Sequence, residues 1–151
     1  MRRYWALAGF SLLVAATQIG WLTFAPVTTG AAAAMDVPVG RVGTLAAVFP
    51  IVYIVVAIPA GRWLDTRFVA ALAAGALATA GASAGRLLQP ENYGWLLIMQ
   101  LILAAAQPVV INGIPAFAAR FFPERERPLA ISLSSAAMFL GMVAALVGLP
   151  P

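Results

Sequence analysis

The chain alternates long stretches that carry no charge with short clusters of charged residues. The charge-free runs span 4–35, 42–61, 68–85, 92–119 and 128–151, and they are 32, 20, 18, 28 and 24 residues long. A helix needs about 20 predominantly apolar residues to cross the hydrocarbon core of a bilayer. The pattern therefore predicts an all-α, polytopic bundle in a single transmembrane domain over residues 1–151. Its five or so spans are expected near 4–30, 41–62, 68–88, 94–119 and 128–149.

The composition indicates that most of the chain is solvated by lipid. Of its 151 residues, 63% are hydrophobic and 9% are charged, whereas a soluble domain is about 45–50% apolar and about 25% charged. A chain of this size could not bury that much apolar surface in a core of its own. The isoelectric point is near 10.7, but no basic patch or recognition module is present. We therefore expect the lipid bilayer, and no nucleic acid, as a partner.

The placement of the arginines predicts how the helices are oriented. If the N-terminus is cytoplasmic, the inside segments hold seven Arg and the outside segments hold two, Arg41 and Arg86. An excess of basic residues in the cytoplasmic segments is the usual arrangement. The sequence thus predicts a multi-pass protein of the plasma (inner) membrane with its N-terminus in the cytoplasm. The seven inside arginines are Arg2, Arg3, Arg62, Arg67, Arg120, Arg125 and Arg127.

The side chains that usually carry out catalysis are missing from the chain. It contains no His and no Cys, and all nine of its basic residues are Arg. The segment GASAG, residues 81–85, matches the G-x-S-x-G pattern of serine hydrolases, but that motif needs a partner base. We therefore expect no enzyme, no metal site and no cofactor.

Five polar or aromatic side chains within the predicted spans are candidates for a substrate path. Gln18 and Trp21 are three residues apart and share one helical face. Tyr53 lies between two prolines, and Gln107 and Asn112 interrupt the fourth apolar run. Polar residues inside a span usually face the protein interior or an aqueous cavity. Two alternatives stay open: Gln18 and Trp21 could form an interhelical hydrogen bond and a packed ring, and Tyr53 could be an ordinary core residue.

The fourth run also contains three residues that disturb helices, namely Pro108, Gly113 and Pro115. Broken helices near the middle of the bilayer are common at transporter binding sites. The alternative is that these residues only kink a structural helix.

The segment GRWLDTR, residues 61–67, resembles the cytoplasmic loop motif of the major facilitator superfamily, which runs Gly, three residues, Asp and then basic residues. Gly61 and Asp65 match in identity and spacing, Arg67 comes one place late, and Phe68 stands where a Gly is usual. The resemblance implies a transporter of twelve spans in two repeats, of which this chain supplies spans 1–5 as a fragment. It also implies that Gly61 lets the turn pack closely. Asp65 would lie near a helix N-terminus and contribute to a contact between the two halves.

A narrower resemblance links the chain to the feline leukaemia virus subgroup C receptor-related transporters. Residues 106–151 are similar to the region around their spans 4 and 5, and QIGWLTF at 18–24 is similar to their first span. The resemblance implies an organic cargo, such as a choline-like cation or haem, and a Trp21 that faces it through a cation–π contact. Phe139 stands where these transporters have Gln before Leu-Gly.

Together these patterns predict membrane transport of a small organic solute by a major facilitator-type secondary transporter, with this chain as its N-terminal part. A missing C-terminal half or a partner membrane subunit is the expected protein partner. The alternative function is a non-transporting membrane scaffold or subunit that packs against a partner membrane protein.

Overall fold

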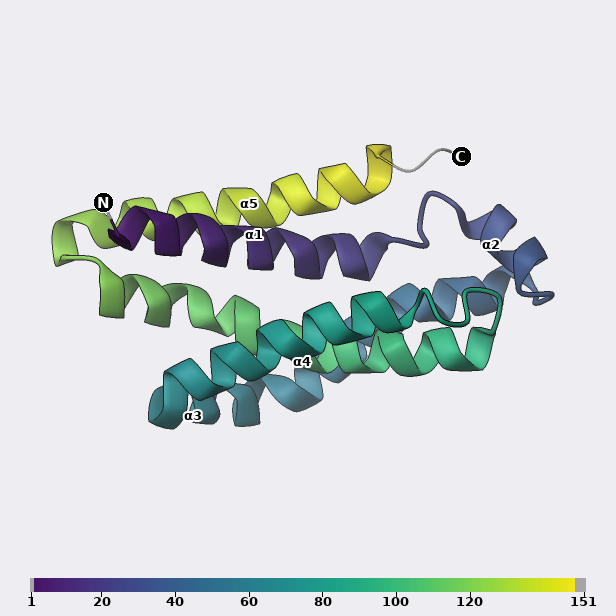
Figure 1. The fold of residues 1–151 in the computed structure, drawn as a ribbon, viewed down its shortest axis with the longest axis horizontal. Helices are drawn as coiled ribbons and strands as arrows, with labels where there is room; N and C mark the ends of the chain where they lie inside the picture. Colours follow the sequence, from purple (N-terminus) through teal and green to yellow (C-terminus); the bar gives the residue numbers. More distant parts are fainter. Residues whose placement is uncertain (1, 149–151) are drawn as a thin grey trace.

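The computed structural model describes residues 2–148, and within this range the chain is helical, with no strand (Figure 1). The predicted all-α bundle is confirmed. Four helical segments, Arg2–Leu22, Val39–Gly85, Tyr93–Phe121 and Glu124–Val147, are long and apolar enough to cross a membrane. The elements in chain order are α1 (Arg2–Leu22), α2 (Thr28–Ala34), α3 (Val39–Gly85), α4 (Tyr93–Phe121), the short 3₁₀ helix η1 (Glu124–Glu126) and α5 (Arg127–Val147).

Helix α3 passes along the bundle twice because it folds back at Arg67. A straight helix of 47 residues would be about 70 Å long, more than twice the roughly 30 Å of a bilayer core. Arg67 has φ −140° and ψ 57°, outside the helical region. The stretches 39–66 and 68–85 run in opposite directions on either side of it (Figure 1). They coincide with the spans predicted near 41–62 and 68–88.

The predicted end of the first span, near residue 30, is wrong. Helix α1 ends at Leu22, and the short helix α2 follows after a turn. The backbone N–H of Ala25 donates to the carbonyl of Leu22 at 3.0 Å to form this turn. Pro26 then disfavours the helical conformation at the residue before it. The long first run therefore contains two helices.

The predicted turn at 62–67 is also shorter than expected. Helical structure continues to residue 66, and only Arg67 leaves it. Leu64 is buried in the bundle, and the hydroxyl of Thr66 donates to the carbonyls of Arg62 and Trp63 at 3.0 and 3.2 Å. Packing of this last turn keeps it helical despite its charges.

Four prolines lie inside helices without ending them. Helix α4 is continuous from Tyr93 to Phe121 through Pro108, Gly113 and Pro115. Helix α3 likewise runs through Pro50 and Pro59. The broken fourth helix expected from the sequence is absent from the described structure, and the alternative of a continuous structural helix holds.

The bundle is built from two pairings: α1 packs along α5, with the two helices running in the same direction, and both halves of α3 pack against α4 (Figure 1). The α1–α5 seam is close in its middle, where a Cβ added to Gly141 would lie 2.5 Å from the carbonyl oxygen of Ala15. The hydroxyl oxygens of Ser11 and Ser134 are 3.4 Å apart in the same seam. Small residues thus let these two helices approach each other.

Large apolar side chains cover the outside of the bundle. Leu12 of α1, Ile54 and Leu77 of the two halves of α3, and Val147 of α5 are each more than 70% exposed. Such an apolar outer surface suits a protein that contacts lipid on its sides.

Candidate functional site

A cavity of about 310 Å³ lies among α1, the first half of α3, α4 and α5. Four of the five predicted path residues line it, although their role as a path stays a prediction. They are Gln18, Trp21, Tyr53 and Gln107, and the other lining residues are Pro50, Ile54, Ile111, Met138 and Met142.

Trp21 is held where Pro50 interrupts the hydrogen bonding of α3. Because proline has no N–H, Pro50 leaves the carbonyl of Ala46, four residues earlier, without its helical donor. The indole Nε1–H of Trp21 donates to this oxygen at 3.0 Å, and the ring stacks on Phe49 with the centroids 6.0 Å apart. Trp21 therefore makes the interhelical hydrogen bond and packed ring of the alternative interpretation, and it lines the cavity as well.

Tyr53 and Asn112 link α3 to α4. The Tyr53 hydroxyl donates to Asn112 Oδ1 at 2.8 Å, and Asn112 Nδ2 donates to the carbonyl of Ala57 at 3.2 Å. Asn112, the fifth predicted residue, thus supports the cavity wall through Tyr53. Its hydrogen bonds also fix the orientation of the Tyr53 ring.

The two cavity glutamines retain hydrogen-bonding capacity. Gln18 is 1% exposed; its Nε2 lies 3.4 Å from Thr17 Oγ1, and its Oε1 has no hydrogen-bond partner. Gln107 is 6% exposed, and its side-chain amide forms no hydrogen bond within residues 2–148. Gln100, on the same helix as Gln107, donates to the carbonyl of Leu45 at 2.9 Å, and its Oε1 also has no hydrogen-bond partner.

The apolar half of the cavity was not predicted from the sequence. Met138 and Met142 are four residues apart on α5, so both reach the same side of the helix. This spacing could have singled them out, but apolar residues at helical spacing are common in any core. Phe139 lies between them and is 60% exposed, so it points away from the lining.

The loop motif lies apart from the cavity. A Cβ added to Gly61 would meet nothing within 4 Å, so the close packing predicted there is wrong. Gly61 lies within the continuing helix, several residues before the bend. Asp65 and Arg67 are exposed near the bend, and in the described part of the chain neither forms an ion pair. Their contribution to a contact between two halves stays a prediction.

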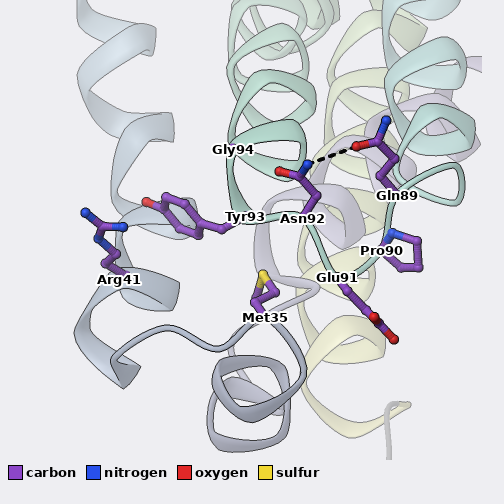
Figure 2. Close-up of a pocket in the computed structure, with 8 residues that line it drawn as sticks. All are labelled: Met35, Arg41, Gln89, Pro90, Glu91, Asn92, Tyr93 and Gly94. Atoms are coloured by element: carbon purple, nitrogen blue, oxygen red, sulfur yellow. Dashed lines mark hydrogen bonds between the residues drawn. The ribbon is translucent and has the colours of Figure 1, made fainter.

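A second hollow, of about 780 Å³, lies around the connection from α3 to α4 (Figure 2). This connection is at the end of the bundle opposite to the loop motif (Figure 1). The Arg41 guanidinium lies 5.6 Å from the ring centroid of Tyr93, and Asn92 Nδ2 donates to Gln89 Oε1 at 3.0 Å. Figure 2 shows Arg41 and Glu91 on different sides of the hollow, pointing apart. Its polar groups do not converge on one point, which distinguishes it from the cavity among the helices.

Arg86 joins the second half of α3 to the end of α1. Its guanidinium donates to the carbonyl of Gly20 at 2.9 Å, one of the last four carbonyls of α1, which lack helical donors. Burial lowers the pKa of Arg86 to about 10, so the group remains charged near neutral pH. This hydrogen bond holds the C-terminal end of α1 against the C-terminal end of α3.

Comparison with known proteins places the chain in a family. The family model of the Major Facilitator Superfamily matches residues 5–149, a range that contains every residue of the cavity and of the loop motif. No curated protein matches the sequence, so the narrower resemblance to the feline leukaemia virus subgroup C receptor-related transporters stays a prediction.

Proposed function

The chain belongs to the major facilitator superfamily of multi-pass membrane transporters, and we propose that it forms the N-terminal part of a transporter that carries a small organic solute. The observation that carries this proposal is the cavity of about 310 Å³ in which Gln18, Trp21, Tyr53 and Gln107 come together from three helices. Ligand sites are typically concave, mostly apolar, and supplied with a few polar groups that fix orientation.

Gln107 contrasts with the two other amide side chains within α4. Polar groups within a membrane-spanning helix are costly unless they serve packing or a function. Gln100 and Asn112 use their amides for backbone carbonyls of α3, which is a packing role. Gln107 leaves its amide free beside the cavity, which supports a role in binding a solute.

The proposal also covers the narrower family of the chain and its orientation in the membrane. The similarity of residues 18–24 and 106–151 supports a place near the feline leukaemia virus subgroup C receptor-related transporters. The seven arginines expected at the cytoplasmic ends support insertion in the plasma (inner) membrane with the N-terminus inside. A C-terminal half or partner subunit would close the cavity from the other side.

Uptake into vesicles prepared from the source cells' membranes tests the function. The vesicles would be offered a mixture of small organic solutes, and the solutes accumulated over time would be identified by mass spectrometry. We expect at least one solute whose accumulation disappears when the chain is deleted. Gln107→Leu should abolish this accumulation because it removes the free amide from the cavity.

Gln100→Leu is the matched control, because Gln100 is a buried glutamine on the same helix that does not line the cavity. It should retain uptake when compared at equal amounts of protein in the membrane. A solute profile that is unchanged by deletion, or uptake lost equally in both variants, would contradict the proposal.

A further inference from the structure

The cavity lining contains no charged side chain that could form an ion pair with an ionic solute. None of its nine lining residues is an acid or an arginine, and all fourteen charged residues lie outside the runs that supply these side chains. Transfer of a carboxylate or an ammonium from water to such a site is unfavourable unless an opposite charge or several hydrogen bonds compensate it. The lining therefore favours a solute without net charge.

The hydrogen-bond donors of the aromatic lining residues are already used. Trp21 Nε1–H is donated to Ala46 O, and the Tyr53 hydroxyl is donated to Asn112 Oδ1. A solute that enters the cavity cannot take these donors without breaking a link between helices. The free polar groups of the lining are consequently those of Gln18 and Gln107.

The hydrogen bonds around Gln18 identify which end of its amide is free. The Thr17 hydroxyl donates to the carbonyl of Val14 at 2.7 Å, so its oxygen is left only as an acceptor. It can pair with the NH₂ group of Gln18, at 3.4 Å, but not with the amide oxygen. This fixes the orientation of the amide and leaves Gln18 Oε1 as an acceptor that has no donor.

From this arrangement we infer that the cavity binds an uncharged solute that carries an O–H or N–H donor on an otherwise apolar or aromatic body. The donor would bond Gln18 Oε1, the Gln107 amide would bond the same polar end of the solute, and the body would lie against Trp21, Met138 and Met142. The inference rests on the proposed function and names its substrate class. This class differs from the choline-like cation that the sequence resemblance implies.

Binding of matched probes to the purified chain tests the inference without requiring transport. The chain would be placed in phosphatidylcholine nanodiscs, and empty nanodiscs would correct for partitioning into lipid. Four probes share a phenylpropyl body: 3-phenylpropan-1-ol, its methyl ether, 3-phenylpropionate and phenylpropyltrimethylammonium. We expect the alcohol to bind about tenfold more tightly than each of the other three, because only the alcohol is both uncharged and a donor.

Two variants locate the effect. Gln18→Leu should remove the preference for the alcohol over its ether, whereas Gln100→Leu should keep it, since Gln100 has an equally unpartnered Oε1 but lies away from the cavity. Equal binding of alcohol and ether by the unmodified chain would overturn the inference. So would tighter binding of either ion, or no saturable binding of the alcohol.

The uptake and binding experiments distinguish failure of the inferred substrate class from failure of the proposed transport function. Uptake that depends on Gln107, together with a preference for an ionic probe, would overturn the inferred substrate class and leave the transport function standing. Selective binding of the alcohol without any uptake would overturn transport instead.

Discussion

At the scale of single residues, the hydrogen bond from Trp21 to the Ala46 carbonyl shows how two unfavourable features compensate each other. Pro50 leaves a carbonyl of α3 without a donor, and a Trp inside a span needs an acceptor for its indole N–H. The indole Nε1–H of Trp21 donates to this carbonyl, that of Ala46, at 3.0 Å, so both requirements are met by one hydrogen bond. We therefore predict that the two residues are energetically coupled.

A double-mutant cycle measures this coupling. Trp21→Phe should cost about 1–3 kcal/mol of stability, because the Ala46 carbonyl loses its donor. In a Pro50→Ala background the new backbone N–H at position 50 can bond that carbonyl, so the same Trp21→Phe change should cost less, with a coupling of about 0.5–3 kcal/mol. Unfolding in mixed micelles would provide the four free energies. An equal cost of Trp21→Phe in both backgrounds would show that the two residues act independently.

How much of the cavity the sequence could predict depends on the residue type. Gln18, Trp21, Tyr53 and Gln107 stand out because polar and amphipathic side chains are rare in apolar runs. Met138 and Met142 do not stand out, because their contribution depends on which face of α5 turns toward α3 and α4. Helix rotation of this kind is set by tertiary packing, which no local pattern records.

At the scale of the helices, the α1–α5 seam depends on a missing side chain. A Cβ at Gly141 would lie 2.5 Å from Ala15 O and 2.8 Å from Ala15 Cα, and these are backbone atoms that cannot turn aside. We expect Gly141→Ala to lower stability by about 1–3 kcal/mol, the usual cost of overpacking. Thermal unfolding of the purified protein in detergent would measure it.

Gly81→Ala is a suitable comparison, since a Cβ at this helical position would meet nothing within 4 Å. It should leave the unfolding temperature unchanged or raise it slightly, as alanine favours helix over glycine. Similar losses in the two variants would mean that the close approach to Ala15 does not limit the seam.

The helix boundaries show what apolar runs can and cannot predict. The runs locate the passes through the membrane because their length and lack of charge are direct physical requirements. They do not show that Pro26 lies in a turn whereas Pro108 lies inside a continuous helix. That difference depends on packing, because α4 is covered by neighbours along much of its length.

At the scale of the whole molecule, the arginines predicted to be cytoplasmic all lie at the same end of the helical bundle. The start of α1, the bend of α3 and the connection from α4 to α5 lie together at one end of the bundle, and α2 and the connection from α3 to α4 lie at the other (Figure 1). The first group carries the seven arginines predicted to be cytoplasmic. Its orientation in the membrane is a prediction that can be tested.

Single cysteines provide that test, because the chain has none of its own. Thr66→Cys lies at the end with the seven arginines, and Glu91→Cys lies at the other end; both positions are exposed. In intact cells a membrane-impermeant maleimide should label only Glu91→Cys, and Thr66→Cys should react after the membrane is opened. The reverse pattern would show that the N-terminus lies outside.

The pairing of α1 with α5 also has a consequence for biosynthesis. These helices lie side by side, but α1 ends at Leu22 and α5 begins only at Arg127, so the ribosome makes α5 much later. At about 5–20 residues per second, the finished α1 waits roughly 6–25 s for the last residues of α5. During this interval the surface around Ser11 and Ala15 meets lipid or the insertion machinery instead of its partner. The nascent chain must therefore keep α1 in the membrane while its binding face is still uncovered, and the seam closes only when translation of α5 is complete.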